Sequence, residues 1–222
     1  MPLHGLRRAS SSISSLTYAF SDSAFQQANL TTYSFTSMNF GTAATDRKII
    51  TAFSGGNVFR NVSSVTIGGV AATALATIKS TGGALTTAMY IADVPSGTSG
   101  TITVVWAGAM TACGIGCWSV YGMNSSTPLD ISTAASISGT QSLTINKGDG
   151  FSLAAYGNYS SSSTNVTWTG DLSEDYEVLI NTTERPHGGA SAVTTGSGTI
   201  SSTATPNTGA YATLIMASFS NA

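Results

Sequence analysis

Apolar residues alternate with small or polar residues in nearly every segment of this chain, and turn-forming residues interrupt the alternation. A period of two places successive side chains on opposite faces of a strand, whereas a helix repeats every 3.6 residues or so. The interruptions are glycine pairs and Pro-, Asn- or Ser-rich clusters, spaced roughly 10–14 residues apart. Short strands at such regular spacing predict a sandwich or barrel instead of alternating strands and helices.

The predicted strands cover most of the chain after residue 15. They are 16–20, 31–36, 48–53, 64–67, 70–78, 87–92, 101–106, 112–121, 142–145, 151–156, 165–169, 176–180, 199–205 and 211–219. The pair Gly68-Gly69 predicts a two-residue hairpin turn, because such turns need positive φ angles. Gly114 and Gly116 leave one face of a strand bare, so a ring such as Trp106 or Trp168 can lie across it. The one candidate for a turn of helix is Ser23–Leu30, where the alternation breaks.

The expected architecture is all-β, a single antiparallel β-sandwich of immunoglobulin-like or jelly-roll type with a short N-terminal arm. Chains of this length, 222 residues, commonly form one β domain. No internal repeat or linker is evident, so the predicted division is an arm over residues 1–15 and a sandwich domain over 16–222. The segment Asn124–Gly139 has the weakest pattern and is expected to be a loop or an edge crossing.

Charge is scarce, at 8% of residues, while serine and threonine together number 67. An average domain carries roughly 25% charged residues. The net charge of −2 and the absence of a basic cluster argue against a nucleic-acid partner. A surface this short of charge favours assembly, so a homo-oligomer is expected, with a trimer preferred.

The two cysteines, Cys113 and Cys117, fall on one predicted strand and share a face. Four residues of strand separate them by roughly 13 Å at ~3.3 Å per residue, and a disulfide needs Cα atoms within about 7 Å. Buried free thiols are therefore expected, in a protein made in a reducing cytosol. No apolar run is long enough for a membrane span, and residues 1–16 do not resemble a secretory signal.

Candidate chemistry is sparse. The acidic cluster DLSEDYE, from Asp171 to Glu177, could supply calcium ligands, although its spacing does not match an EF-hand loop; an exposed acidic turn is the simpler interpretation. A glycan hydrolase would use Asp171 or Glu174 with Asp175. His187, in RPHGG, is expected to be a solvated loop residue, because no nucleophile elbow accompanies it. No catalytic residue, metal ligand or cofactor is predicted.

Two kinds of contact residue are predicted. The Tyr156–Asn165 segment is polar, and Tyr156 and Tyr159 are candidates for contact with a glycan. The arm is Ser-rich and unlike the remainder of the chain, and Leu3, Leu6, Arg7 and Arg8 are its candidate partner-binding residues.

Five segments in order resemble a pattern of tailed-bacteriophage and prophage virion proteins. These are DRKIITAFSGG, VSSVTIGGVAATALA, TTAMYIADVPSGTSGTITVVWAGAMTACGIGCWSVYGM, GDGFSLAAYG and TWTGDLSEDYE, and the match covers residues 30–217. The resemblance implies a sandwich without catalytic apparatus, in a head decoration, head-fibre or tail-fibre protein. It carries over no functional residues.

The expected function is therefore that of a non-enzymatic virion structural protein, on the capsid surface as decoration or head fibre and held there by its arm. Its partners would be other virion proteins of the capsid or tail. The alternative is a tail-fibre, receptor-binding or carbohydrate-binding module that attaches to a host-surface glycan. The third interpretation is the glycan hydrolase.

Overall fold

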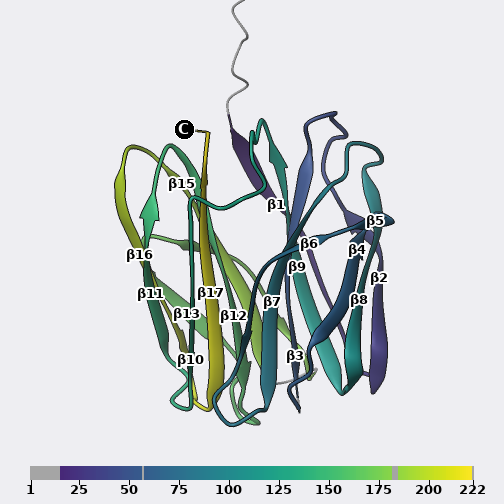
Figure 1. Ribbon diagram of the computed structural model, residues 1–222. Coiled ribbons are helices and arrows are strands. Elements are labelled where there is room, and N and C mark those ends of the chain that lie inside the picture. Colours follow the sequence, from purple (N-terminus) through teal and green to yellow (C-terminus); the bar gives the residue numbers. More distant parts are fainter. Residues whose placement is uncertain (1–15, 57, 182–184, 222) are drawn as a thin grey trace, which may run out of the picture.

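The computed structural model describes residues 16–56, 58–181 and 185–221, and in these residues it is built of antiparallel strands without a helix (Figure 1). No helix in this part of the chain has the length and apolar character needed to cross a membrane. The strands are β1 Thr17–Gln26, β2 Leu30–Asn39, β3 Lys48–Gly56, β4 Val62–Ile67, β5 Val70–Ala71, β6 Thr73–Lys79, β7 Leu85–Asp93, β8 Ser99–Met110, β9 Ala112–Tyr121, β10 Asp130–Ser136, β11 Gln141–Lys147, β12 Gly150–Tyr159, β13 Val166–Gly170, β14 Ser173–Leu179, β15 Pro186–Thr194, β16 Gly198–Pro206 and β17 Tyr211–Ser220.

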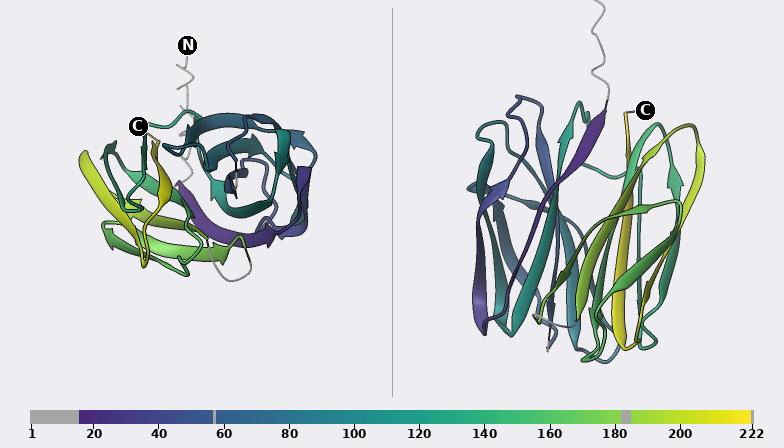
Figure 2. Two further views of the ribbon diagram at one scale, coloured as in Figure 1. Left: turned by 90° about the horizontal axis from the view of Figure 1, so that it is seen from below. Right: turned by 180° about the vertical axis from the view of Figure 1, so that it is seen from behind.

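The all-β, antiparallel prediction is confirmed, but the single sandwich is wrong, because the strands form four sheets. The first half of the chain forms an inner sheet, β1-β9-β3-β7-β6, and an outer sheet, β2-β8-β4-β5. The second half forms an inner sheet, β10-β17-β12-β15-β14, and an outer sheet, β11-β16-β13. The two halves lie side by side (Figure 2).

The two halves repeat one strand order, although no repeat is evident in the sequence. With β10 taken as the counterpart of β1, β17 of β9, β12 of β3 and β15 of β7, the second inner sheet has the order of the first. The outer sheets match in the same way, β11-β16-β13 against β2-β8-β4. The inner sheets face each other with β1 beside β14 and β10 beside β6, so the halves are related by an approximate two-fold axis.

Three apolar cores follow from this layering. One lies between the sheets of the first half, one between the sheets of the second, and the third joins the two inner sheets. The third core contains Ile50, Trp118, Leu153, Ile215 and Phe219. Central inner strands are therefore buried on both faces, which is why β9 and β17 read as nearly continuous apolar and small residues.

Two expectations about local structure are wrong. The candidate helical turn at Ser23–Leu30 is mostly strand, since β1 continues to Gln26 and pairs along β9. The weakly patterned Asn124–Gly139 contains an edge strand, β10, paired with β17. The hairpin turn is confirmed: Gly68 and Gly69 have φ values of +59° and +84°, and Ile67 pairs with Val70.

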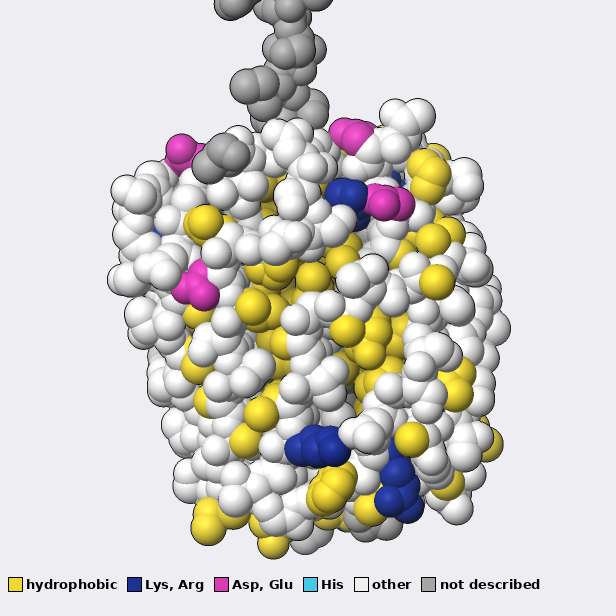
Figure 3. Space-filling view, viewed as in Figure 1, with side chains coloured by type: hydrophobic (Ala, Val, Ile, Leu, Met, Phe, Trp, Pro, Cys, Tyr) yellow, Lys and Arg dark blue, Asp and Glu magenta, His cyan; other side chains and the backbone are white. Residues whose placement is uncertain are grey.

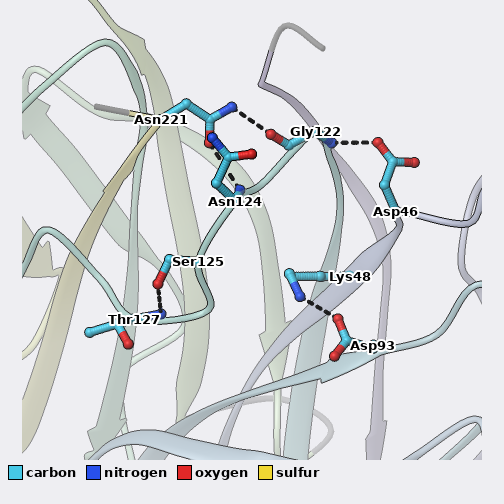
Figure 4. Close-up of polar contacts among 8 residues, drawn as sticks. All are labelled: Asp46, Lys48, Asp93, Gly122, Asn124, Ser125, Thr127 and Asn221. Carbon is cyan, nitrogen blue, oxygen red and sulfur yellow. Dashed lines mark hydrogen bonds and ion pairs between the residues drawn. The ribbon is translucent and has the colours of Figure 1, made fainter. Parts of the chain in front are cut away.

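The connection between the halves is fixed at the end where β1 begins and β17 ends, here called the upper end (Figure 4). Gly122 donates its N–H to Asp46 of the first half at 2.8 Å and accepts a bond from the Asn221 side chain. The same Asn221 accepts the N–H of Asn124 at 3.1 Å. Side chains from both halves thus hold the segment that crosses between them. The end of the molecule opposite the upper end is called the lower end.

Candidate functional site

Three aromatic side chains line up across both halves at the lower end. Tyr159, the last residue of β12, pairs in register with Tyr211, the first residue of β17. Cross-strand partners point to the same face of a sheet, so the two rings are neighbours. The Tyr211 ring lies over Gly82 in the β6–β7 turn, where an added Cβ would come within 2.4 Å of the ring. The glycine therefore allows a ring of the second half to cover a turn of the first.

Phe59 continues this line on the far side of the same turn. A Cβ at Gly83 would lie 2.7 Å from the Phe59 ring, and Phe59 donates its N–H to the Gly83 carbonyl at 2.9 Å. Phe59 is 44% exposed and Tyr211 36% exposed. Phe59, Tyr211 and Tyr159 are called the aromatic row below.

A cation stands at each end of the aromatic row. The Lys79 ammonium lies 4.7 Å from the centre of the Phe59 ring, and the Arg185 guanidinium lies 4.1 Å from the centre of the Tyr159 ring. Both distances are within the range of cation–π attraction. The row with its two cations offers flat apolar faces and positive charge on one surface.

The described carboxylates gather at one end of the molecule. Most described carboxylates lie in or beside upper-end turns: Asp46, Asp93, Asp130, Asp149, Asp171, Glu174 and Asp175. The described cations are divided evenly, with Arg60, Lys79 and Arg185 at the lower end and Arg47, Lys48 and Lys147 at the upper end. Figure 3 shows acidic side chains in the upper half of one face, one of them beside a cationic side chain, and cationic side chains beside hydrophobic ones at the bottom.

The two predicted glycan contacts have different environments. Tyr159 is half-buried within the aromatic row. Tyr156 is wholly buried, and its hydroxyl donates to the Gly139 carbonyl at 2.6 Å, which is not compatible with contact to a surface glycan. Burial raises the pKa of Tyr156. Sequence reasoning missed Phe59 and Tyr211, whose only signal is an aromatic residue at the border of a turn.

The acidic cluster does not converge on one point. Asp171 accepts the N–H of Ser201 at 2.7 Å, Asp175 accepts the indole N–H of Trp118 at 2.7 Å, and Glu177 accepts the N–H of Val166 at 2.6 Å. Burial raises the pKa of Glu174, Asp175 and Glu177. Among the described residues no group of three His, Cys, Asp or Glu side chains is arranged to hold a metal ion.

His187 is not a solvated loop residue, as the sequence predicted, but a buried residue of β15 between the inner sheets. Its Nδ1 lies 2.9 Å from both Ser54 Oγ and the Tyr156 carbonyl, and its Nε2 lies 2.8 Å from the Tyr176 hydroxyl and 3.2 Å from the Ala52 carbonyl. Burial lowers the pKa of His187 to about 4, so the ring is neutral near pH 7. Ser54 is also fully buried, so this serine–histidine pair has no path to a substrate at the surface.

A chain of hydroxyl groups extends the histidine network between the halves. Ser54 Oγ lies 2.6 Å from Thr87 Oγ1, which lies 2.7 Å from Thr213 Oγ1 of the second half. A polar network inside an apolar interface stabilises one alignment of the two sheets, because any shift leaves buried groups unpaired. The network thus has a structural explanation.

The prediction for the cysteines is confirmed, since Cys113 and Cys117 are free and buried. Burial raises the pKa of the Cys117 thiol to about 12 and also raises that of Cys113. Neither thiol is therefore a thiolate near pH 7. The predicted arm residues Leu3, Leu6, Arg7 and Arg8 lie outside the described residues.

Comparison with known proteins identifies no relative by sequence: no family model matches the chain, and no curated protein matches it.

Proposed function

We propose that this protein is a non-enzymatic structural component of a tailed-phage virion, made in the host cytoplasm and placed on the capsid surface as a decoration or head-fibre protein. Residues 1–15 attach it to the particle, through Leu3, Leu6, Arg7 and Arg8. Its partners are other virion proteins of the capsid or tail, and it acts as a homo-oligomer, with a trimer preferred.

The observation that carries this proposal is the strand order of both halves. An inner sheet ordered β1-β9-β3-β7 against an outer sheet ordered β2-β8-β4-β5 is the arrangement of a jelly roll, and the second half follows the same order. Jelly rolls occur in viral capsid and lectin domains. Fold alone does not assign function, so this support is by analogy. We therefore assign each half to the jelly-roll type within the proposal.

The surface also suits packing against other copies. Hydrophobic side chains gather along the seam between the halves, over β6, β7, β10 and β17 (Figure 3). The partly buried Leu75, Ile78 and Ile131 belong to the core that reaches this seam. The edge strand β10 carries one charge, Asp130, and β6 carries one, Lys79. Few charges on an edge leave it open to association.

Deletion of residues 1–15 tests the proposal. The truncated chain should keep the circular dichroism spectrum and thermal midpoint of the full chain, because the three cores lie within the described residues. It should be absent from particles produced by the genome that encodes it, as judged by mass spectrometry of purified virions. Normal incorporation of the truncated chain, or absence of the full chain from the particles, would refute the proposal.

The second candidate function is attachment to a host surface, as a receptor-binding or carbohydrate-binding module. The aromatic row favours it, because its exposed rings can stack on sugar rings and the neighbouring cations can attract anionic groups. Binding of the fluorescently labelled full chain to host cells tests it. Absence of binding to every candidate host strain would exclude it.

A further inference from the structure

The lower end combines exposed aromatic rings with cations, and together these features indicate which kind of ligand the surface can bind. Its aromatic row crosses from one half to the other, with Phe59 and Tyr211 exposed on either side of a turn that contains Gly82 and Gly83. The turn leaves the two rings without a bulky side chain between them. A ligand lying along the row would meet flat apolar faces contributed by both halves.

We propose that the aromatic row binds an acidic glycan. Sugar rings stack on the exposed faces of Phe59 and Tyr211, and carboxylate or phosphate groups of the glycan lie near Lys79 and Arg185. The proposal rests on the second candidate function and adds the site and the class of ligand.

The charge of the ligand follows from the two cations. The one ion pair among the described residues, Lys48 with Asp93, lies at the upper end. No described carboxylate therefore comes within 4.0 Å of the Lys79 ammonium or the Arg185 guanidinium. Both cations are half-buried against rings, which reduces their contact with water and strengthens attraction to an anion.

A glycan suits this surface better than a nucleic acid does. Single-stranded nucleic acids also stack on aromatic side chains, but their binding depends on a groove of many cations that follows the phosphates. Among the residues that the structure describes, the lower end has three cations, Arg60, Lys79 and Arg185, on a chain of net charge −2. The hydroxyl group of Thr81 is exposed in the same turn and can bond to a sugar hydroxyl.

The test measures binding of defined oligosaccharides to the full chain by isothermal titration calorimetry at low salt. The probes are hexagalacturonate, the same hexamer as its uncharged methyl ester, and a sugar chain linked by phosphodiesters. We expect the ester to bind at least tenfold more weakly than hexagalacturonate or the phosphodiester chain. Tyr211→Ala and Lys79→Gln should each weaken binding of the acidic probe at least tenfold. Comparison of the two acidic probes shows whether carboxylate or phosphate is preferred.

Matched controls come from the upper end. Lys147→Gln removes a cation and Val193→Ala removes an apolar side chain that is 73% exposed, and neither should alter binding. Equal affinity for the acid and its ester would overturn the acidic assignment, and unchanged affinity in Tyr211→Ala would overturn the site. Tighter binding of an oligothymidylate than of either acidic glycan, or no binding of any probe, would overturn the proposal. Tyr211→Ala should still enter virions, so failure here is distinguishable from failure of the virion proposal.

Discussion

His187 shows how a residue type typical of catalysis serves packing in this protein. A neutral imidazole has one N–H and one acceptor nitrogen. When Nδ1 carries the proton, Nδ1 donates to the Tyr156 carbonyl and Nε2 accepts from the Tyr176 hydroxyl. When Nε2 carries the proton, Nε2 donates to the Ala52 carbonyl and Nδ1 accepts from the Ser54 hydroxyl. Either tautomer is satisfied, whereas the protonated ring would hold a buried charge.

This burial predicts a specific loss of stability in acid. The pKa of His187 is about 4 in the folded protein, below an unfolded value of about 6.5. Between these values the unfolded chain binds a proton that the folded protein does not, so the free energy of unfolding falls as pH falls from about 6.5 towards 4. The loss is about 1.4 kcal/mol per pH unit across this window.

Urea unfolding of the wild type and His187→Gln at pH 7 and pH 4.5 measures this effect. The wild type should lose about 2–3 kcal/mol more than the variant between the two pH values. Carboxyls whose pKa is raised, such as Asp175, act in the opposite direction but are common to both proteins. Parallel pH profiles would contradict the prediction. An NMR titration of the His187 ring provides the same test without a variant, since it should remain neutral at pH 5.

At the scale of elements, a single side chain joins two upper-end connections of the first half. Arg47 is fully buried and donates five hydrogen bonds to backbone carbonyls. Three of these carbonyls belong to the β7–β8 connection, at Val94, Ser96 and Gly97, and two follow β2, at Phe40 and Gly41. The bonds are 2.7–3.1 Å long. A planar guanidinium with five donors is suited to this arrangement, and lysine with three is not.

Arg47→Met should therefore destabilise the protein by about 3 kcal/mol, because several bonds to a charged donor are lost. Hydrogen exchange should accelerate first at the amide of Phe40, which donates to the Thr98 carbonyl at 2.8 Å beside the arginine. Arg47→Lys should give a smaller effect of the same kind. Acceleration at the amide of Ile200 in the second half, paired with Ile145, reports the loss of global stability, and acceleration at Phe40 should exceed it. Uniform acceleration at both amides would show that the arginine does not act on the connections in particular.

At the scale of the whole molecule, the shared core makes the two halves one cooperative unit. Leu153 and Phe151 of the second half pack in the same core as Ile50 and Trp118 of the first. A half separated from its partner would expose an entire inner sheet. Large apolar surfaces of this kind are seldom left in water by a folded protein.

Unfolding should accordingly be a single transition. Leu153→Ala, a change in the second half, should cost about 2–5 kcal/mol. It should lower the urea midpoint equally for fluorescence of Trp106 and Trp118, which lie in the first half, and for circular dichroism of the whole chain. Both proteins should carry Trp168→Phe, which removes the tryptophan of the second half, so that the tryptophan fluorescence comes from the first half. Two separate transitions, with the first half unaffected by Leu153→Ala, would contradict the prediction.

Local patterns in the sequence were sufficient to predict most of the strands, the antiparallel class and the burial of the two thiols. Period-two alternation and turn residues act within a few neighbouring residues, so β9 is predicted at Ala112–Tyr121 with its observed bounds. The sequence patterns did not predict two strands, β10 and β15, because their glycine, alanine and serine residues are typical of loops. In β15, Gly189 is bare because the rings of Tyr176 and Trp118 occupy the space of a side chain. Gly116 likewise accommodates Tyr176 and not the tryptophan rings expected.

The layering of these strands and the contacts between their side chains depend on long-range packing, which no local pattern encodes. The alternation of a strand tells which face is apolar but not what covers it, and an inner strand buried on both faces loses the alternation altogether. The division into four sheets and the burial of His187 therefore depend on packing between segments far apart in the chain. The aromatic row also depends on packing between segments far apart in the chain. Tyr159 ends β12 and Tyr211 begins β17, so strand pairing makes these two neighbours, and contact of Tyr211 with the β6–β7 turn of the first half brings Phe59 onto the same surface.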